Sequence, residues 1–291
     1  MRASPLNPPC SWPGGKSVFA PAIIEALGGF KALEPGYYGQ TGRYFEPFCG
    51  LAAVALAVRH EGFGGEIVLT DIDPSVVNLW RVVKDKPEDL HDCLSRLALN
   101  TAEPEFYRLR DIQNSDVQDP TEHAARMIYL SKRAHAGLFR RNSSGRVNMP
   151  VGHGKGEGFT VQPLSYFVDL HYTLQHSSIA RASGVDVINL AGAEDLVFAD
   201  PPYADSHGYG LARWGISETA KVVRSLERAA GRGARCVMTE HDSPAVLALL
   251  GDRWRVKTVE VSARIQRKVA GVDRPVRREI IATVDGWQNR R

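Results

Sequence analysis

The sequence has few cysteines, and no spacing among them predicts a shared site. The chain has 291 residues, and its four cysteines, Cys10, Cys49, Cys93 and Cys236, include no close pair. No disulfide framework and no zinc-ligand spacing is therefore visible. The nine histidines include no HExxH pattern, which is the helical spacing of a catalytic zinc site. We expect four reduced thiols and no bound metal.

Long apolar runs are also missing. The longest one, residues 51–58, is far shorter than the ~20 residues that a membrane-spanning helix needs. Residues 1–10 lack the apolar centre of a signal peptide. With 43% hydrophobic and 24% charged residues, the composition is typical of a globular chain. We therefore expect a cytoplasmic protein with no membrane partner.

Acidic residues are absent from one long stretch of the chain. Residues 123–156 contain seven lysines and arginines and no acid, and residues 253–278 contain nine against two acids. The net charge of +3 hides these two basic blocks. A charge run is usually a solvated face, but a block without any acid also suits a phosphate-bearing partner.

Apolar strand patterns alternate with amphipathic helix patterns along much of the sequence. Strands are predicted at residues 42–50, 66–73, 185–188, 196–199 and 235–239, with helices at 51–60, after Pro74, at 217–230 and at 243–250. This alternation predicts an α/β fold with a mostly parallel sheet. Residues 254–262 and 278–284 alternate like antiparallel strands and would form an edge hairpin.

A different pattern interrupts this alternation. Residues 87–99, 103–113, 122–133 and 163–176 predict helices, whereas residues 134–159 predict loops with one hairpin. We therefore expect a sheet domain of residues 1–84 and 181–291 with an inserted subdomain of residues 85–180.

Two predicted strand ends carry residues suited to a ligand. In open parallel sheets, ligands bind beyond the carboxyl ends of the strands. Gly50 follows the first strand, where a glycine lets a ligand approach the backbone. Asp71 lies 21 residues further on, near the ~20-residue offset of a carboxylate that binds ribose hydroxyls. The alternatives are a plain tight turn at Gly50 and a helix cap at Asp71, although Asp73 is better placed for capping.

A third strand end, after residues 196–199, carries the sequence Asp-Pro-Pro-Tyr at residues 200–203. Its two prolines remove two backbone donors and stiffen the loop, which leaves the carbonyls free to accept hydrogen bonds. A carboxylate, a free carbonyl and an aromatic ring within four residues suit a planar substrate with an amino group. The alternative is a rigid structural turn.

Four segments together resemble the Dam-type DNA adenine methyltransferases, which use S-adenosylmethionine. Residues 12–16 (WPGGK) resemble the N-terminal W-x-G-G-K motif, residues 46–50 (EPFCG) the cofactor motif, and residues 200–203 (DPPY) the catalytic motif. Residues 137–142, 145 and 148–150 resemble the target-recognition segment. The resemblance runs from about residue 11 to residue 284 and implies a Rossmann-like methyltransferase sheet with an inserted DNA-recognition subdomain.

The family's activity implies a reaction and its partners. The chain would be a site-specific DNA adenine-N6 methyltransferase that acts on a flipped-out adenine in double-stranded DNA. It would work as a monomer, with a dimer as the alternative, and would associate with the nucleoid of a bacterial or phage-infected cell. A restriction-modification system is one setting for such an enzyme. No cysteine lies in the loop at residues 200–203, which argues against methylation of cytosine carbon 5.

The resemblance also implies roles for single residues. The Asp200 carboxylate and the Pro201 carbonyl would accept the adenine amino hydrogens, Pro202 would stiffen the catalytic loop, and Tyr203 would stack on the base. Implied cofactor-binding residues are Trp12, Gly14, Gly15, Lys16, Glu46, Pro47, Phe48, Gly50, Asp71, Ile72 and Asp200. DNA-binding residues implied by the recognition segment are Leu138, Arg140, Arg141, Asn142, Asn148 and Pro150. The charge of the first basic block separately predicts phosphate contacts at Arg133, Arg141 and Lys155. Arg140 is expected to read a guanine.

Several positions depart from the family pattern. Ser11 stands where members that methylate GATC have a lysine, and His135 and Ala136 replace an aromatic residue and an asparagine. Ala52 replaces a frequent glycine. The target is therefore expected to be GATC or a related short site. The alternatives are an amino methyltransferase for RNA adenine, cytosine N4 or protein glutamine, and an inactive DNA-binding relative. A nicotinamide dehydrogenase is disfavoured because no GxGxxG follows the first strand.

Overall fold

A computed structural model describes most of the chain. The described residues are 4–11, 14–29, 42–115, 119–137, 139–142, 144–152, 159–204, 214–262 and 276–286. Trp12, Leu138 and Lys155, which the sequence analysis assigned to the cofactor and DNA sites, lie outside them, as do residues 264–274 of the second basic block.

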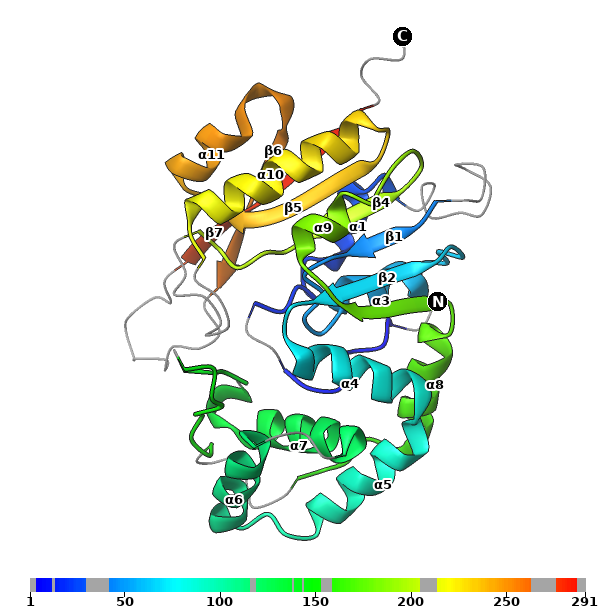
Figure 1. Ribbon diagram of the computed structural model, residues 1–291, viewed down its shortest axis with the longest axis vertical. Helices are drawn as coiled ribbons and strands as arrows, with labels where there is room; N and C mark the ends of the chain where they lie inside the picture. The colour runs from blue at the N-terminus through cyan, green and yellow to red at the C-terminus, as the bar shows by residue number, and fades with distance from the viewer. Residues whose placement is uncertain are drawn as a thin grey trace.

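Within the described residues, a seven-stranded sheet has the order β3-β2-β1-β4-β5-β7-β6 (Figure 1). Five strands run parallel: β1 (Tyr44–Glu46), β2 (Ile67–Asp71), β3 (Ser177–Arg181), β4 (Leu196–Ala199) and β5 (Arg235–His241). The antiparallel strand β7 (Val276–Asp285) lies between β5 and β6 (Arg255–Ser262). The expected Rossmann-like methyltransferase fold, with its antiparallel edge hairpin, is confirmed.

Side chains alternate along the strands and fill two cores on opposite faces of the sheet. In β4, Leu196 and Phe198 belong to one core, whereas Val197 and Ala199 belong to the other. The first core includes α1 (Ala20–Ala26), α3 (Ala53–His60) and α4 (Pro74–Asp85). The second includes α9 (Gly184–Ile188), α10 (Ile216–Gly231) and α11 (Pro244–Leu250), which the short helix η2 (Gly251–Arg253) follows. Burial on both faces explains the apolar runs seen in the sequence.

The residues after α4 build a helical unit. It consists of α5 (Pro87–Ala98), α6 (Glu103–Gln113), α7 (Pro120–Arg133), the short helix η1 (His135–Gly137) and α8 (Leu164–Leu174). Figure 1 shows α5, α6 and α7 gathered on one side of the sheet, below it in that view. Helix α7 packs against α4, α5 and α6, so the unit is joined to the sheet domain through α4.

Three elements differ from the sequence prediction, and the first of them, helix α1, was not predicted at all. Residues 185–188, expected as a strand, lie in helix α9, where Gly184, Val187 and Ile188 are buried at helical spacing. So short a segment does not distinguish the helical period of 3.6 residues from the strand period of 2. Strand β3 was missed because it is an edge strand of mostly exposed residues, and it therefore lacks an apolar signal.

Candidate active site

The carboxyl ends of four neighbouring strands meet at one edge of the sheet. From the central pair β1 and β4, the parallel strand order runs outward in opposite directions, to β2 and β3 on one side and to β5 on the other. A ligand crevice forms at such a switch point. Glu46 ends β1, Asp71 ends β2 and Asp200 follows β4. The fold therefore brings three predicted site residues to one edge.

The turn after β1 is tied to the end of β2. The Gly50 amide donates to Asp71 Oδ2 at 3.0 Å, and the Asp73 amide donates to Asp71 Oδ1 at 2.9 Å. Burial raises the pKa of Asp71 to about 6, although both amides favour its charged form. Gly50 (φ 44°) and Ala52 (φ 49°) both adopt left-handed backbone, so the family's frequent glycine at position 52 has a conformational reason.

Glu46 is a buried carboxyl group, 2% exposed, at the end of β1. The Tyr44 hydroxyl donates to its Oε2 at 2.7 Å. Burial raises the pKa of Glu46 to about 8, and the negative charge of Asp200 contributes to the rise. The two carboxyl groups therefore interact across the β1–β4 pair.

Two donors hold the Asp200 carboxylate. Lys16 Nζ lies 2.9 Å from Oδ2, and the Thr239 hydroxyl donates to Oδ1 at 2.6 Å. Lys16 is only 5% exposed, and its Nζ also donates to the Gly14 carbonyl at 2.7 Å. The N-terminal motif and the catalytic motif are thus joined by a buried lysine.

The Tyr203 ring is held at its hydroxyl and by its neighbours. Its hydroxyl donates to Glu279 Oε2 at 2.7 Å, and its ring meets His241 edge to face at 4.4 Å between centroids. Lys16 Nζ lies 5.1 Å from the ring centroid and 3.9 Å from Glu279 Oε2. Burial and nearby carboxylates raise the pKa of Tyr203 well above its ordinary value. The ring therefore stays neutral and fixed.

Side chains from β5 and β7 that no sequence motif predicted support this loop. Besides Thr239 and Glu279, they include Glu240, which is fully buried and accepts a hydrogen bond from the Ala204 amide at 2.9 Å. The polar run Thr-Glu-His at the end of the otherwise apolar strand β5 was an available signal. Glu279 had no local signal, because only the pairing of β7 with β5, which sets it opposite His241, brings it to this edge.

The recognition segment forms a hairpin. Arg141 pairs with Val147 and Ala134 with Val151 in antiparallel bridges. Arg140, Asn148 and Pro150 are exposed on it. These three predicted DNA-binding residues therefore lie on one accessible structural unit.

Three other predicted DNA-binding side chains contact protein atoms. Arg133 donates to the Thr101 carbonyl at 2.7 Å, and Arg141 donates to Asp73 at 3.1 and 3.2 Å and to Ser75 at 2.7 Å. The Asn142 side-chain oxygen accepts from the backbone amides within the hairpin turn. Their DNA contacts stay a prediction.

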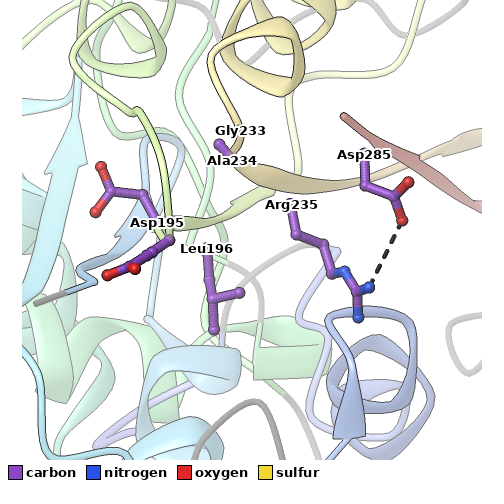
Figure 2. A pocket seen from close by; sticks show the side chains of 7 residues that line it. Asp195, Leu196, Gly233, Ala234, Arg235 and Asp285 are labelled. Atoms are coloured by element: carbon purple, nitrogen blue, oxygen red, sulfur yellow. Dashed lines mark ion pairs between the residues drawn. The ribbon is translucent and has the colours of Figure 1, made fainter. Parts of the chain in front are cut away.

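A hollow at the opposite edge of the sheet contains none of the predicted site residues. Figure 2 shows it at the amino ends of β4 and β5, where Arg235 and Asp285 form an ion pair at 3.7 Å. Its lining residues are Glu194, Asp195, Leu196, Gly233, Ala234, Arg235 and Asp285. The candidate active site is therefore at the carboxyl edge.

Within the described part of the chain, no group of three or more histidine, cysteine, aspartate or glutamate residues is arranged to hold a metal ion. None of its helices has the length and apolar character needed to cross a membrane.

Some solved structures resemble the chain at low identity. The rRNA methyltransferase aviRa from Streptomyces viridochromogenes is 15% identical, with a TM-score of 0.41, over 93% of this chain and 86% of that one.

Comparison with known sequences points to one family. The chain is 26% identical over 248 residues to the DNA N-6-adenine-methyltransferase of Escherichia phage P1, which covers 83% of this chain but 30% of that protein. It is 27% identical over 282 residues to the Type II methyltransferase M.MjaIII of Methanocaldococcus jannaschii, which covers 90% of this chain and 94% of that protein. It is 25% identical over 233 residues to the DNA adenine methylase of Haemophilus influenzae, covering 76% of each. Residues 12–265 match the family model described as D12 class N6 adenine-specific DNA methyltransferase. Because this match spans the cofactor motif, the recognition hairpin and the catalytic loop, the chain belongs to the D12 class of N6 adenine-specific DNA methyltransferases.

Proposed function

We propose that this chain transfers a methyl group from S-adenosylmethionine to the N6 amino group of an adenine in double-stranded DNA. Membership of the family supports this reaction. The observation that carries the proposal is the Asp200 carboxylate, which Lys16 and Thr239 hold at the switch point between β1 and β4. A rigid acceptor at this edge suits a substrate amino group.

The residues at the ends of β1 and β2 fit the parts of S-adenosylmethionine. The Glu46 carboxyl oxygens would accept a hydrogen bond from the ammonium of its methionine end, and the N-terminus of α3 favours the carboxylate of that end. Asp71 would bind the ribose, while Ile72, 49% exposed, offers an apolar surface to the adenine ring. The other residues proposed for this site are Trp12, Gly14, Gly15, Lys16, Pro47, Phe48 and Gly50.

The proposed mechanism starts from a weak nucleophile. The adenine amino nitrogen shares its lone pair with the ring, and it becomes more reactive when acceptors hold both of its hydrogens. The Asp200 carboxylate and the Pro201 carbonyl would be these acceptors, and the carboxylate would stabilise the positive charge that develops on the nitrogen. Bound S-adenosylmethionine would supply the methyl group, and S-adenosylhomocysteine and one proton of the amino group would be released. Because Lys16 and Thr239 already orient Asp200, little reorganisation is needed during the reaction.

Tyr203 would stack on the target base after the base leaves the duplex, a step that costs a few kcal/mol. The contacts of Tyr203 with Glu279 and His241 support this role, because they preset the position of the ring. Pro202 would keep the loop rigid between the two acceptors and the ring.

Residues 85–180 would form the target-recognition subdomain, except that β3 from Ser177 belongs to the sheet. The protein would work on DNA as a monomer at the nucleoid, and its site would be GATC or a related sequence. Three departures from the family pattern, Ser11, His135 and Ala136, lie near one another in the fold. The Ser131 hydroxyl donates to the Ser11 carbonyl at 2.8 Å and to the carbonyl of the adjoining Gly137 at 3.3 Å. These departures would therefore act together on sequence choice.

The function is tested by incubating the protein with radiolabelled S-adenosylmethionine and, separately, duplex DNA with and without GATC, RNA, and a protein extract. Nucleosides from the labelled polymer are then identified by mass spectrometry. We expect N6-methyladenine in duplex DNA. Label only in RNA, in protein or on cytosine N4 would replace this proposal with the corresponding alternative.

Substitution of Gly184 tests whether Phe48 belongs to the cofactor site. A Cβ at position 184 would lie 2.2 Å from the Phe48 ring, so Gly184→Ala must displace the ring. We expect the Kd for S-adenosylhomocysteine, measured by calorimetry, to rise about tenfold, since overpacking costs 1–3 kcal/mol. Gly192→Ala is the matched control because its Cβ meets nothing within 4 Å. Unchanged affinity in Gly184→Ala would remove Phe48 from the site.

Glu46 makes the folding stability depend on pH. Its pKa is 4.5 when unperturbed and about 8 in the folded protein. Between these values the folded state binds one more proton than the unfolded state, so the free energy of unfolding falls as pH rises, by up to about 1.4 kcal/mol per pH unit. Urea unfolding should show a steeper fall from about pH 5 to pH 8 in the wild type than in Glu46→Gln. If the free energy of unfolding changed with pH in the same way in both proteins, the raised pKa would not belong to Glu46.

A further inference from the structure

The outer face of the recognition hairpin carries four polar side chains. The backbone amide of Asn142 donates to the Arg146 carbonyl at 2.8 Å, and the backbone amide of Asn148 donates to the Arg140 carbonyl at 3.4 Å. These bonds flank the bridge between Arg141 and Val147. Because side chains alternate along a strand, Arg140, Asn142, Arg146 and Asn148 lie on the face opposite that bridged pair.

The inner face of the hairpin is fixed to the protein. Val147 is 2% exposed, and its backbone amide and carbonyl bond to the Asn114 side chain at 2.6 and 3.0 Å. Arg141 is bound to Asp73, and Arg110 donates to the Met149 carbonyl at 3.3 Å. The outer face is therefore held in one orientation, as a binding surface requires.

The four outer side chains differ in the hydrogen bonds that they already make with the protein. The Asn142 oxygen accepts from the amides of Ser144 and Arg146, both at 3.0 Å, so this side chain holds the turn. Arg140 and Arg146 are exposed, and their guanidinium groups make no hydrogen bond or ion pair with any other residue that the structure describes. By contrast, the guanidinium groups of Arg133 and Arg141 donate to protein acceptors. Among the residues that the structure describes, Arg140 and Arg146 are thus the hairpin arginines whose guanidinium groups have no protein partner.

We propose that Arg146 is a second base-reading residue, which recognises a guanine in the major groove at a base pair different from the one that Arg140 reads. The proposal rests on the proposed function. A two-stranded ribbon fits the major groove, and the arginine fork matches guanine O6 and N7. Arg146 lies two residues before Asn148, which pairs with Arg140, and is therefore nearer the turn of the hairpin. This displaces it along the ribbon by about 7 Å, which is about two base-pair steps.

The test uses the full chain and a duplex library randomised on both sides of one adenine. Methylated molecules from wild type, Arg146→Ala, Arg140→Ala and Arg224→Ala are isolated and sequenced. Arg224 is an exposed arginine on α10 and serves as the control. We expect Arg146→Ala to lose the guanine preference at one base pair and to lower kcat/KM on the preferred site about 10- to 100-fold. Arg140→Ala should lose the base preference at a different base pair. Arg224→Ala should keep the wild-type preference at both base pairs.

Two results would overturn the proposal. One is an unchanged sequence profile in Arg146→Ala. The other is an equal loss on every sequence together with a weaker salt dependence, which would make Arg146 a phosphate contact. A wild-type protein that methylates no member of the library would instead count against the proposed function, because the inference about Arg146 concerns only the choice among methylated sequences.

Discussion

Asp200→Asn should lower kcat for adenine methylation by about 100- to 1,000-fold, measured in a single turnover at saturating DNA and cofactor. The amide keeps the size of the side chain but removes the negative charge that would stabilise the developing cation on the adenine nitrogen. Thr239 and Lys16 hold the carboxylate through hydrogen-bond distances of 2.6 and 2.9 Å, so the loss should arise at the reacting nitrogen.

Asp242→Asn is the matched control for this prediction. Asp242 follows β5 at the same edge of the sheet, but its carboxylate pairs with exposed Arg278 at 3.0 Å. Its replacement should leave kcat unchanged. If Asp200→Asn kept the wild-type kcat while binding DNA and cofactor normally, the carboxylate would have no catalytic role.

Lys16→Met should lower both activity and stability. The substitution leaves Asp200 without its cationic partner and removes the positive charge beside Glu279. We expect kcat to fall about 100-fold. The free energy of unfolding should fall by about 2 kcal/mol, below the usual effect for a fully buried pair because Asp200 is 20% exposed. Urea denaturation and single-turnover assays measure the two effects.

The double variant Lys16→Met/Asp200→Asn separates these effects. Removing both charges should restore part of the stability, because no unpaired carboxylate then remains at Asp200. Activity should stay at the level of Asp200→Asn. Full stability in Lys16→Met alone would mean that this ion pair contributes little to folding.

The sequence predicted the strand ends that form the site, because those signals are local. Apolar runs followed by Gly50, Asp71 and Asp200 mark three parallel strands whose ends share one edge. The parallel order of β2, β1 and β4 then sets these residues side by side. The antiparallel hairpin of β6 and β7 was also predictable, because the side-chain character in both segments alternates with the period of two that is typical of a strand.

The supports of the site were not predictable from the sequence. Thr239 and Glu279 reach Asp200 and Tyr203 only because β5 lies beside both β4 and β7. Arg141, assigned to DNA from its charge, bonds to Asp73 because the hairpin folds against the N-terminus of α4. Charge in a sequence does not say which acceptor a long side chain will meet.

The sequence by itself determined which groups the candidate site contains: a carboxylate, a carbonyl between two prolines and an aromatic ring within residues 200–203, and a second carboxylate at the end of another strand. These features depend on residues that are neighbours in the chain, so they can be recognised from the sequence alone. Only the tertiary structure decided which donors orient that carboxylate and which arginines keep free donors on the hairpin. Those outcomes depend on pairing between segments far apart in the chain, and no local residue pattern encodes such pairing.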